Sequence, residues 1–173
     1  MDIRLHHKSI SIIQDIDKAI LVMRSAGKWL LESGKNPSKW WQLQNLNREF
    51  LLQHAEPDEF YVVLIDNKPA AAAILQNSER NQSWKSIDKQ HPQLALYIHW
   101  LCVNRKYAGK NLPQILVDFA CTQAKNKGLK LLRLDASADE EKLINVYKKL
   151  GFHLMGTEQE DNWTTAFFQK SVV

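Results

Sequence analysis

The sequence predicts an α/β protein in which helices flank a mixed sheet. Two patterns along the chain support this fold class: helical and strand-like segments alternate, and glycine- or proline-containing breaks separate them. The chain has 173 residues, of which 45% are hydrophobic and 24% charged, as is usual for one globular domain. We therefore expect a single domain over residues 1–173, with helices covering the sheet.

Caps and turns delimit the expected elements. Asp15 or Asp17 suits a helix start, and Gly128 and Gly151 suit helix ends because glycine readily adopts the left-handed conformation found there. In the first half of the chain, the expected order is a strand over 4–14, a helix from Asp15 or Asp17 to the break at 33–37, a helix over 37–54, and strands over 59–65 and 69–76 joined by a hairpin turn at 66–68. A polar loop over 77–92 follows. The remaining elements are expected to be a strand over 94–103, a helix over 111–127, a strand over 130–135, a helix over 139–150, and strands over 152–158 and 163–172.

Charge and composition exclude several classes of function. The 23 basic residues outnumber the 19 acidic ones, giving a net charge of +4, but they are scattered and form no nucleic-acid-binding motif. No apolar run reaches membrane-spanning length, and the N-terminus has no hydrophobic signal region. We expect a cytoplasmic protein without nucleic-acid or membrane partners. The two cysteines, Cys102 and Cys121, indicate neither disulfides nor a metal site.

The stretch from Leu94 to Leu116 has the features of a phosphate site. An apolar strand ends at Val103, a basic turn containing Gly109 follows, and a helical pattern begins near Asn111. Free N–H groups in such a turn, together with the positive end of a helix, attract phosphate. The alternative is an ordinary strand-to-helix connection. Several lysines around the turn suit a multiply phosphorylated ligand, namely Lys106, Lys110, Lys125, Lys127 and Lys130.

Together with the later segment Tyr147-Lys-Lys-Leu-Gly151-Phe152, this stretch resembles the acyl-CoA-binding core of the GNAT superfamily of N-acetyltransferases. Gly109 matches the first glycine of the family signature, Arg/Gln-x-x-Gly-x-Gly/Ala, and Ala108 takes the place of the usual Arg or Gln. Asn111 and Pro113 replace the later glycines. The resemblance extends over nearly the whole chain and implies a mostly antiparallel central sheet.

The resemblance implies acetyl-CoA as the cosubstrate. Its diphosphate would lie on the backbone of the turn, and its pantetheine amides would pair with the end of the preceding strand. Asn111 tolerates left-handed backbone angles, and Pro113 suits a first helical turn but offers no N–H. The implied contact residues are Leu101, Cys102, Val103, Ala108, Gly109, Lys110, Asn111, Leu112 and Pro113.

Tyr147 and His99 are the expected catalytic residues. Tyr147 matches the tyrosine that stands near the cofactor sulfur in many relatives, where it would protonate the leaving thiolate. Packing is the alternative, because Leu143, Tyr147 and Leu150 share one helix face. His99, on the central strand, has a suitable pKa for a general base, but equally suits a hydrogen-bonded sheet histidine. Asp135 could be a base, a substrate anchor or a turn residue.

The implied function is transfer of an acetyl group to a primary amine of a small molecule, by direct attack in a ternary complex. The alternatives are an enzyme that modifies protein N-termini or lysines, and a non-catalytic acyl-CoA sensor. A homodimer is possible, and no metal is expected. Aromatic and acidic residues of the implied acceptor region suit an organic cation, namely Trp29, Trp40, Trp41, Trp84, Tyr97, Trp100, Trp163, Glu32, Glu49, Glu56, Glu59 and Asp161.

Overall fold

The computed structural model describes residues 3–5, 8–35, 37–79 and 82–173. The chain divides into two compact units: Met1–Leu75 with Trp100–Leu116, and Gln76–His99 with Val117–Val173. The strand β5 (Leu96–Val103) and the helix α4 (Leu112–Asn126) contribute residues to both units. A single domain over residues 1–173 stays a prediction.

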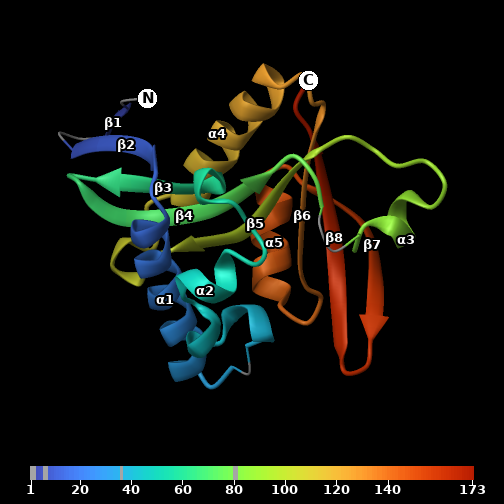
Figure 1. Ribbon diagram of the computed structural model, residues 1–173, viewed down its shortest axis with the longest axis horizontal. Coiled ribbons are helices and arrows are strands. Elements are labelled where there is room, and N and C mark those ends of the chain that lie inside the picture. Colours follow the sequence, from blue (N-terminus) through green and yellow to red (C-terminus); the bar gives the residue numbers. More distant parts are fainter. Residues whose placement is uncertain (1–2, 6–7, 36, 80–81) are drawn as a thin grey trace. The chain divides into compact units, whose positions relative to one another are not determined.

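The first unit combines an antiparallel sheet with α1 and several short helices (Figure 1). The strands follow the order β1-β2-β3-β4, and the second half of β5 neighbours β4. β1, β2, β3 and β4 pair antiparallel. The elements are β1 (Ile3–Leu5), β2 (Lys8–Gln14), α1 (Ile16–Glu32), the 3-10 helices η1 (Lys39–Trp41) and η2 (Leu43–Asn45), α2 (Arg48–Leu51), the 3-10 helix η3 (Pro57–Glu59), β3 (Phe60–Ile65), β4 (Lys68–Gln76) and the 3-10 helix η4 (Arg105–Tyr107).

Local sequence explains the boundaries of α1 and of the β3–β4 hairpin. The Asp15 side chain caps α1 by accepting a hydrogen bond from the N–H of Lys18 at 2.9 Å. At the predicted hairpin turn, Asp66 and Asn67 have φ angles of 48° and 64°. Two left-handed residues in succession are typical of the tight turn whose twist matches that of a hairpin.

The long helix predicted over residues 37–54 is wrong. The segment forms η1, η2 and α2 instead. The Asn45 side chain donates to the carbonyl of Lys39 at 2.7 Å, and the Asn47 side chain accepts from the N–H of Phe50 at 2.9 Å. These asparagines bind the backbone locally and start new turns, which competes with a continuous helix.

The strand predicted over 4–14 forms two strands, β1 and β2. Residues 6–7, which come between them in the sequence, lie outside the described residues. Residue 36 in the predicted break, and residues 80–81 in the predicted loop, also lie outside them.

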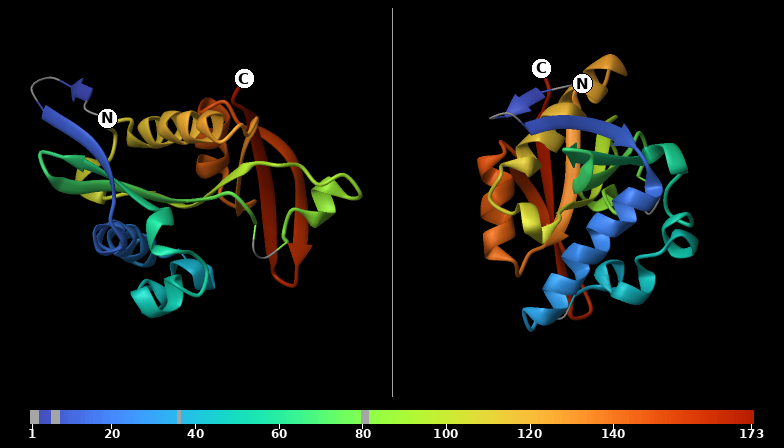
Figure 2. Two further views of the ribbon diagram at one scale, coloured as in Figure 1. Left: turned by 45° about the horizontal axis from the view of Figure 1, so that its top comes forward. Right: turned by 90° about the vertical axis from the view of Figure 1, so that its left-hand side faces the viewer.

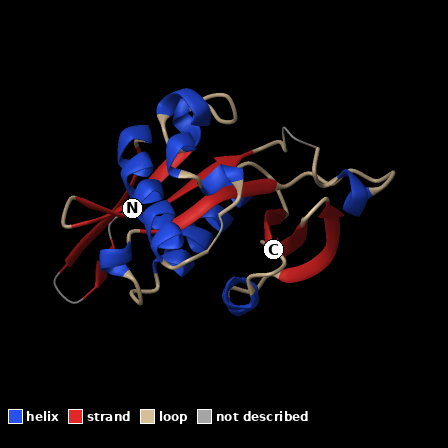
Figure 3. Cartoon of the chain, turned by 90° about the horizontal axis from the view of Figure 1, so that it is seen from below, coloured by secondary structure: helices blue, strands red, loops and turns tan. Residues whose placement is uncertain are grey.

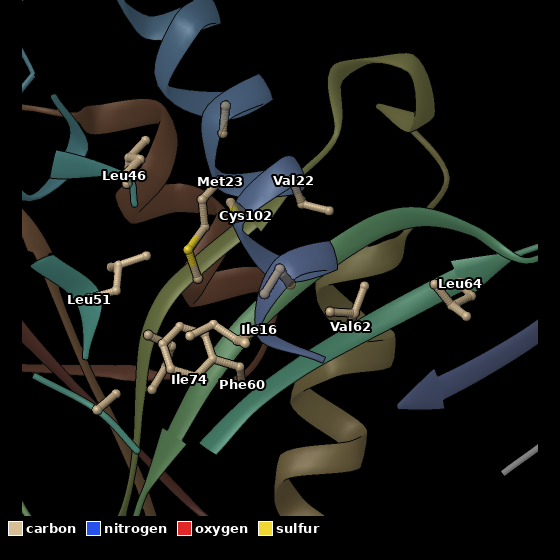
Figure 4. Packing of buried hydrophobic residues seen from close by; sticks show 14 residues of the cluster. Ile16, Val22, Met23, Leu46, Leu51, Phe60, Val62, Leu64, Ile74 and Cys102 are labelled. Carbon is tan, nitrogen blue, oxygen red and sulfur yellow. The ribbon is translucent and has the colours of Figure 1, made fainter. Parts of the chain in front are cut away.

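The core of the first unit lies where α1 packs against β3 (Figure 4). Apolar residues of α1, α2, β3 and β4 meet there, together with Cys102 from the second half of β5. Val22, Met23 and Leu51 are fully buried. Burial of side chains of this size contributes about 1.5–3 kcal/mol each, so this cluster stabilises the strand end that precedes the proposed phosphate turn.

The second unit contains the start of β5, most of α4, and the elements α3 (Lys85–Asp88), β6 (Leu131–Ser137), α5 (Glu141–Lys149), β7 (His153–Glu160) and β8 (Trp163–Ser171). Its strands follow the order β5-β6-β8-β7. β5 and β6 are parallel, whereas β6, β8 and β7 pair antiparallel. The short helix α3 interrupts the connection that was predicted to be a polar loop (Figure 3).

The predicted fold class is confirmed: the sheet is mixed, mostly antiparallel and flanked by helices. Within the described part of the chain, every helix is too short or too polar to cross a membrane.

Candidate active site

The turn that joins β5 to α4 is anchored within the first unit. The Asn104 N–H donates to the carbonyl of Ala70 at 2.8 Å, and its side-chain amide donates to the carbonyl of Pro69 at 3.2 Å. The Arg105 guanidinium lies 4.0 Å from the centre of the Trp29 ring. These contacts tie the start of the turn to β4 and α1, so the residues that follow leave from a defined position.

The backbone of residues 108–111 is open to solvent. Gly109 and Asn111 have φ angles of 79° and 58°, the left-handed region that glycine and asparagine adopt most readily. A Cβ atom built on Gly109 would meet nothing within 4 Å. In the described part of the chain, the N–H groups of Gly109, Lys110 and Asn111 have no acceptor within the protein.

Helix α4 begins directly after this turn, at Leu112, which is 1% exposed, and Pro113 lies in its first turn. Exposed N–H groups at the start of a long helix suit an anionic ligand, because the helix dipole favours negative charge there. The residues present therefore fit a diphosphate, and binding of one by Ala108 to Pro113 stays a prediction. Pro113 removes one donor from the set.

The strand end that precedes the turn alternates between half-buried and buried residues. Leu101 and Val103 are half-buried, whereas Cys102 is 7% exposed and joins the core of the first unit. Burial raises the pKa of the Cys102 thiol, so the thiol stays protonated at neutral pH. A protonated, buried thiol is a poor nucleophile.

The two faces of the sheet in the second unit carry different predicted residues. On β8, Phe167 contacts the Trp84 ring at 5.1 Å between centroids, and Phe168 contacts the Tyr147 ring at 5.5 Å. Neighbouring residues of a strand point to opposite faces. Trp84 and Tyr147 therefore lie on opposite faces, in agreement with the positions of α3 and α5 on either side of the β7–β8 hairpin (Figure 2).

Tyr147 lies on α5 and is 6% exposed. Its ring also meets Phe152 at 6.3 Å between centroids. Gly151, at a φ of 87°, ends the helix as the sequence predicted. The ring is packed whichever role its hydroxyl has, and the catalytic role of Tyr147 stays a prediction.

His99 lies on the other face of the same sheet. Its ring stacks on that of Tyr97 with an interplanar angle of 9° and 6.5 Å between centroids, and residues two apart on a strand share a face. Burial lowers the pKa of His99 to about 4. At neutral pH the imidazole is therefore uncharged and binds a proton weakly.

Arg133 is a buried cation on that same face. Its NH1 and NH2 groups donate to the two Asp88 carboxylate oxygens at 2.8 and 2.7 Å, and Nε donates to Gln169 at 2.9 Å. The guanidinium also lies 4.2 Å from the centre of the Trp84 ring. Sequence reasoning missed this cluster, although an arginine within an apolar strand was a signal, because fully buried arginines are rare unless paired.

Asp135 stands two residues beyond Arg133 on β6. Burial, and then the Glu79 carboxylate, raise the pKa of Asp135 to about 6. Across the residues described, no hydrogen bond or ion pair reaches the Asp135 carboxylate. The strands β5 and β6 pair only at Leu96↔Leu132 and Tyr97↔Arg133, so they separate just before His99 and Asp135.

The aromatic residues predicted to bind the acceptor do not form one group. In the first unit, Trp40, Phe50, His54 and Trp100 make ring contacts, and Trp100 Nε1 donates to the carbonyl of Trp40 at 2.9 Å. Trp84 and Tyr97 meet in the second unit at 6.3 Å between ring centroids.

The other predicted acceptor residues have separate surroundings. Trp41 packs on the core of the first unit, and Trp163 is 37% exposed. Glu56 and Glu59 cap η3 reciprocally. Glu32, Glu49 and Asp161 are exposed.

The sequence profile of the acetyltransferase (GNAT) family matches residues 26–152. This match covers more than half of the chain, so the chain belongs to the GNAT acetyltransferase family. It is therefore an acyltransferase, with acetyl-CoA as its cosubstrate.

Individual relatives are more distant. The chain is 25% identical over 153 residues to an uncharacterised N-acetyltransferase, YesJ, of Bacillus subtilis (strain 168), covering 86% of this chain and 82% of that protein. A GNAT-family acetyltransferase from Listeria monocytogenes superposes with a TM-score of 0.74 at 19% identity, covering 99% of both chains. The PaiA N-acetyltransferase of Thermoplasma acidophilum, solved in complex with coenzyme A, gives a TM-score of 0.68 at 20% identity, covering 94% of this chain and 99% of that one.

Proposed function

We propose that this protein acetylates the primary amine of a small molecule, and that the amine attacks acetyl-CoA directly within a ternary complex. When bound, acetyl-CoA supplies the acetyl group as a thioester and leaves as a thiol. The observation that carries the proposal is the turn before α4, with exposed N–H groups at Gly109, Lys110 and Asn111 in a chain of the GNAT family.

The proposed ligand contacts fall into two sets. The backbone of Ala108 to Pro113 holds the diphosphate, and the backbone of Leu101 to Val103 pairs with the pantetheine amides. These contacts use main-chain atoms, so the departures from the family signature at Ala108 and Asn111 change the affinity more than the mode of binding. Tyr147 donates a proton to the departing thiolate.

Direct attack is favoured over an acyl-enzyme by the state of the cysteines. Burial raises the pKa of both Cys102 and Cys121. A covalent route needs a thiolate, and burial favours the protonated form of both thiols, outweighing the Lys170 and Lys125 charges near Cys121. A single-step transfer within a ternary complex needs no such residue.

A small organic amine is supported by the aromatic surfaces in the predicted acceptor region. Trp40, Phe50, His54 and Trp100 form a half-buried cluster, and Trp40 already accepts the Lys39 ammonium over its ring at 4.6 Å. Aromatic faces attract organic cations, and apolar walls with few polar groups are typical of small-molecule sites.

The test is an acetyl-transfer assay over a panel of small primary amines, with thiol release followed continuously and products identified by mass spectrometry. We expect at least one amine to be acetylated well above the amine-free rate of hydrolysis. Peptides with a free N-terminus or an internal lysine are assayed in parallel, and faster turnover of a peptide would favour a protein acetyltransferase. Acetyl-CoA binding by calorimetry without transfer to any acceptor would identify a sensor domain instead.

A further inference from the structure

We propose that Asp135 is the general base of this enzyme, which receives the acceptor as an ammonium ion and takes its proton. The inference deepens the proposed function and rests on it. It assigns to a side chain of β6 a step for which the sequence suggested His99.

The first argument is the contrast between Asp135 and Arg133. Both lie on β6, two residues apart and hence on the same face. The Arg133 guanidinium is bidentate to Asp88 and also donates to Gln169, so its charge is fully neutralised without Asp135. The cation on this strand is therefore committed elsewhere, and among the described residues none pairs with the Asp135 carboxylate.

The second argument is the cost of that unpaired carboxylate. An ionised carboxylate in partly desolvated surroundings is unfavourable unless a cation or hydrogen-bond donors compensate it. Within the described residues, neither is supplied to Asp135, and Glu79 adds a second negative charge. Asp135 is only part-buried, so a ligand can reach it. An ammonium group satisfies these requirements, since it brings one positive charge and three donors.

A second polar group on this face, the indole N–H of Trp84, also has no acceptor among the described residues. The Trp84 ring is 2% exposed and packs on Phe167, which pairs with Asp135 across β6 and β8. Its Nε1–H group is buried, and no described residue accepts from it. Buried N–H groups normally have a partner, so an orphaned one indicates bound water or a ligand atom.

The third argument is position along the sheet. His99 and Asp135 are each two residues beyond Tyr97↔Arg133, the last pair that joins β5 and β6. Asp135 therefore stands where the two parallel strands have just separated, on the same face as His99 and on the face opposite Tyr147. In this arrangement the proposed proton acceptor and the proposed proton donor lie on opposite faces of the sheet.

Protonation equilibria agree with this geometry. A base works best when its pKa lies near the operating pH, and burial together with Glu79 brings the pKa of Asp135 to about 6. The pKa of His99, lowered by burial to about 4, makes it the weaker base. Among the described residues, contacts and strand register place Asp88, Tyr97, His99, Arg133, His153, Glu158 and Glu160 on this face, and Glu79 acts on Asp135 through its charge.

The proposed proton transfers balance. The substrate enters as R–NH₃⁺, and one N–H bond breaks as Asp135 gains an O–H bond. The freed lone pair forms the N–C bond as the C–S bond breaks, and Tyr147 gives its O–H proton to the departing sulfur. The nitrogen then loses a second proton to water, Tyr147 regains one proton from water, and Asp135 releases its proton to water. The net reaction converts an ammonium and a thioester into an amide, a thiol and one proton.

The test compares the wild type with Asp135→Asn and with the matched control Asp139→Asn, which makes the same change at an exposed residue just after β6. Turnover is measured from pH 5 to 9 with the best amine of the panel, and coenzyme A affinity is measured by calorimetry. We expect Asp135→Asn to lower kcat at least ~100-fold and to abolish the acidic limb near pH 6, with coenzyme A affinity unchanged. The control keeps both the rate and the limb.

A second readout needs no turnover. In the free protein, the Asp135 side-chain carboxyl is followed by carbon-13 NMR during a pH titration. We expect a pKa near the value of about 6 set by its surroundings, which falls in Glu79→Gln because a neighbouring negative charge is removed.

Two results overturn the inference: an Asp135 carboxyl that titrates at the ordinary value, or an Asp135→Asn variant that keeps the wild-type rate and acidic limb. A wild-type enzyme that acetylates no amine overturns the proposed function itself, and with it the role of base. The two failures are distinguishable because the first appears only in the variant or in the titration.

Discussion

The turn before α4 in the first unit and the charged face of β6 in the second unit carry charge-binding groups of different kinds. The turn presents exposed backbone N–H groups at Gly109 to Asn111, held by left-handed angles. The face of β6 carries side-chain charges, with Arg133 1% exposed and saturated by partners. Main-chain donors do not depend on the identity of the side chain, so we expect the turn to bind the diphosphate despite its departures from the family signature. A buried side-chain charge tolerates no such change, because its partner would remain unpaired.

The same comparison applies within β6. The charge of Arg133 is neutralised by Asp88, and its guanidinium also donates to Gln169, whereas Asp135 has no partner among the described residues. Full satisfaction indicates a structural role, and an unpaired carboxylate in a partly buried position indicates a functional one. The predictions below test this distinction.

The largest expected effect is the loss of stability in Arg133→Met. The substitution leaves the Asp88 carboxylate, whose side chain is 11% exposed, without its cation. Breaking a buried pair from one side costs about 3–5 kcal/mol of the free energy of unfolding. Urea denaturation followed by circular dichroism measures the change. The double variant Arg133→Met/Asp88→Leu is the control and should recover most of the loss; no recovery would mean that packing, not charge, dominates here.

Asp135→Asn should raise the free energy of unfolding, whereas Arg133→Met lowers it. We expect this increase only at higher pH. The folded pKa, about 6, lies above the ordinary value of 3.8, so folding favours the protonated carboxyl. That contribution is fully present below pH 3.8 and is lost as the pH rises through about 6. The asparagine variant should therefore match the wild type at low pH and be more stable by up to about 3 kcal/mol above pH 7. Urea denaturation across this pH range measures it, and a pH-independent difference would contradict the assignment.

Tyr147→Phe tests the proposed proton donor, which lies on the opposite face of the same sheet from Arg133 and Asp135. The ring contacts with Phe152 and Phe168 survive the change, so we expect stability to shift by less than about 1 kcal/mol. Loss of the proton donor should lower kcat by about 100-fold, equivalent to about 2.7 kcal/mol, with coenzyme A affinity unchanged. Steady-state kinetics and calorimetry separate the two effects. Unchanged turnover would assign Tyr147 to packing alone.

The smallest expected effect concerns the turn. Restoring the family signature with Asn111→Gly and Pro113→Gly adds one backbone donor and should tighten coenzyme A binding about tenfold, or about 1.4 kcal/mol. Greater backbone freedom in the unliganded turn offsets part of the gain. Calorimetry at fixed salt makes the measurement, with pantetheine, which lacks the diphosphate, as the control ligand. An equal gain for pantetheine would show that the turn does not bind the diphosphate.

Local sequence predicted the fold well where short-range chemistry decides structure. The capping Asp15, the left-handed pair Asp66 and Asn67, and the helix-ending Gly151 set boundaries through contacts within a few residues. The same reasoning failed over residues 37–54, where the asparagines bind backbone groups that a continuous helix would have used.

The sequence by itself determined the strand–turn–helix order of the proposed phosphate site and the segment that carries Tyr147, because backbone geometry and glycine positions are local properties. Only the tertiary structure decided which charges are paired. The bidentate contact with Asp88 neutralises Arg133, which pairs with Tyr97 across the strands. Asp135 has no such partner among the described residues. Burial then moves the pKa of His99 down and that of Asp135 up. Pairing and desolvation depend on residues distant in sequence, so no local pattern could assign the base.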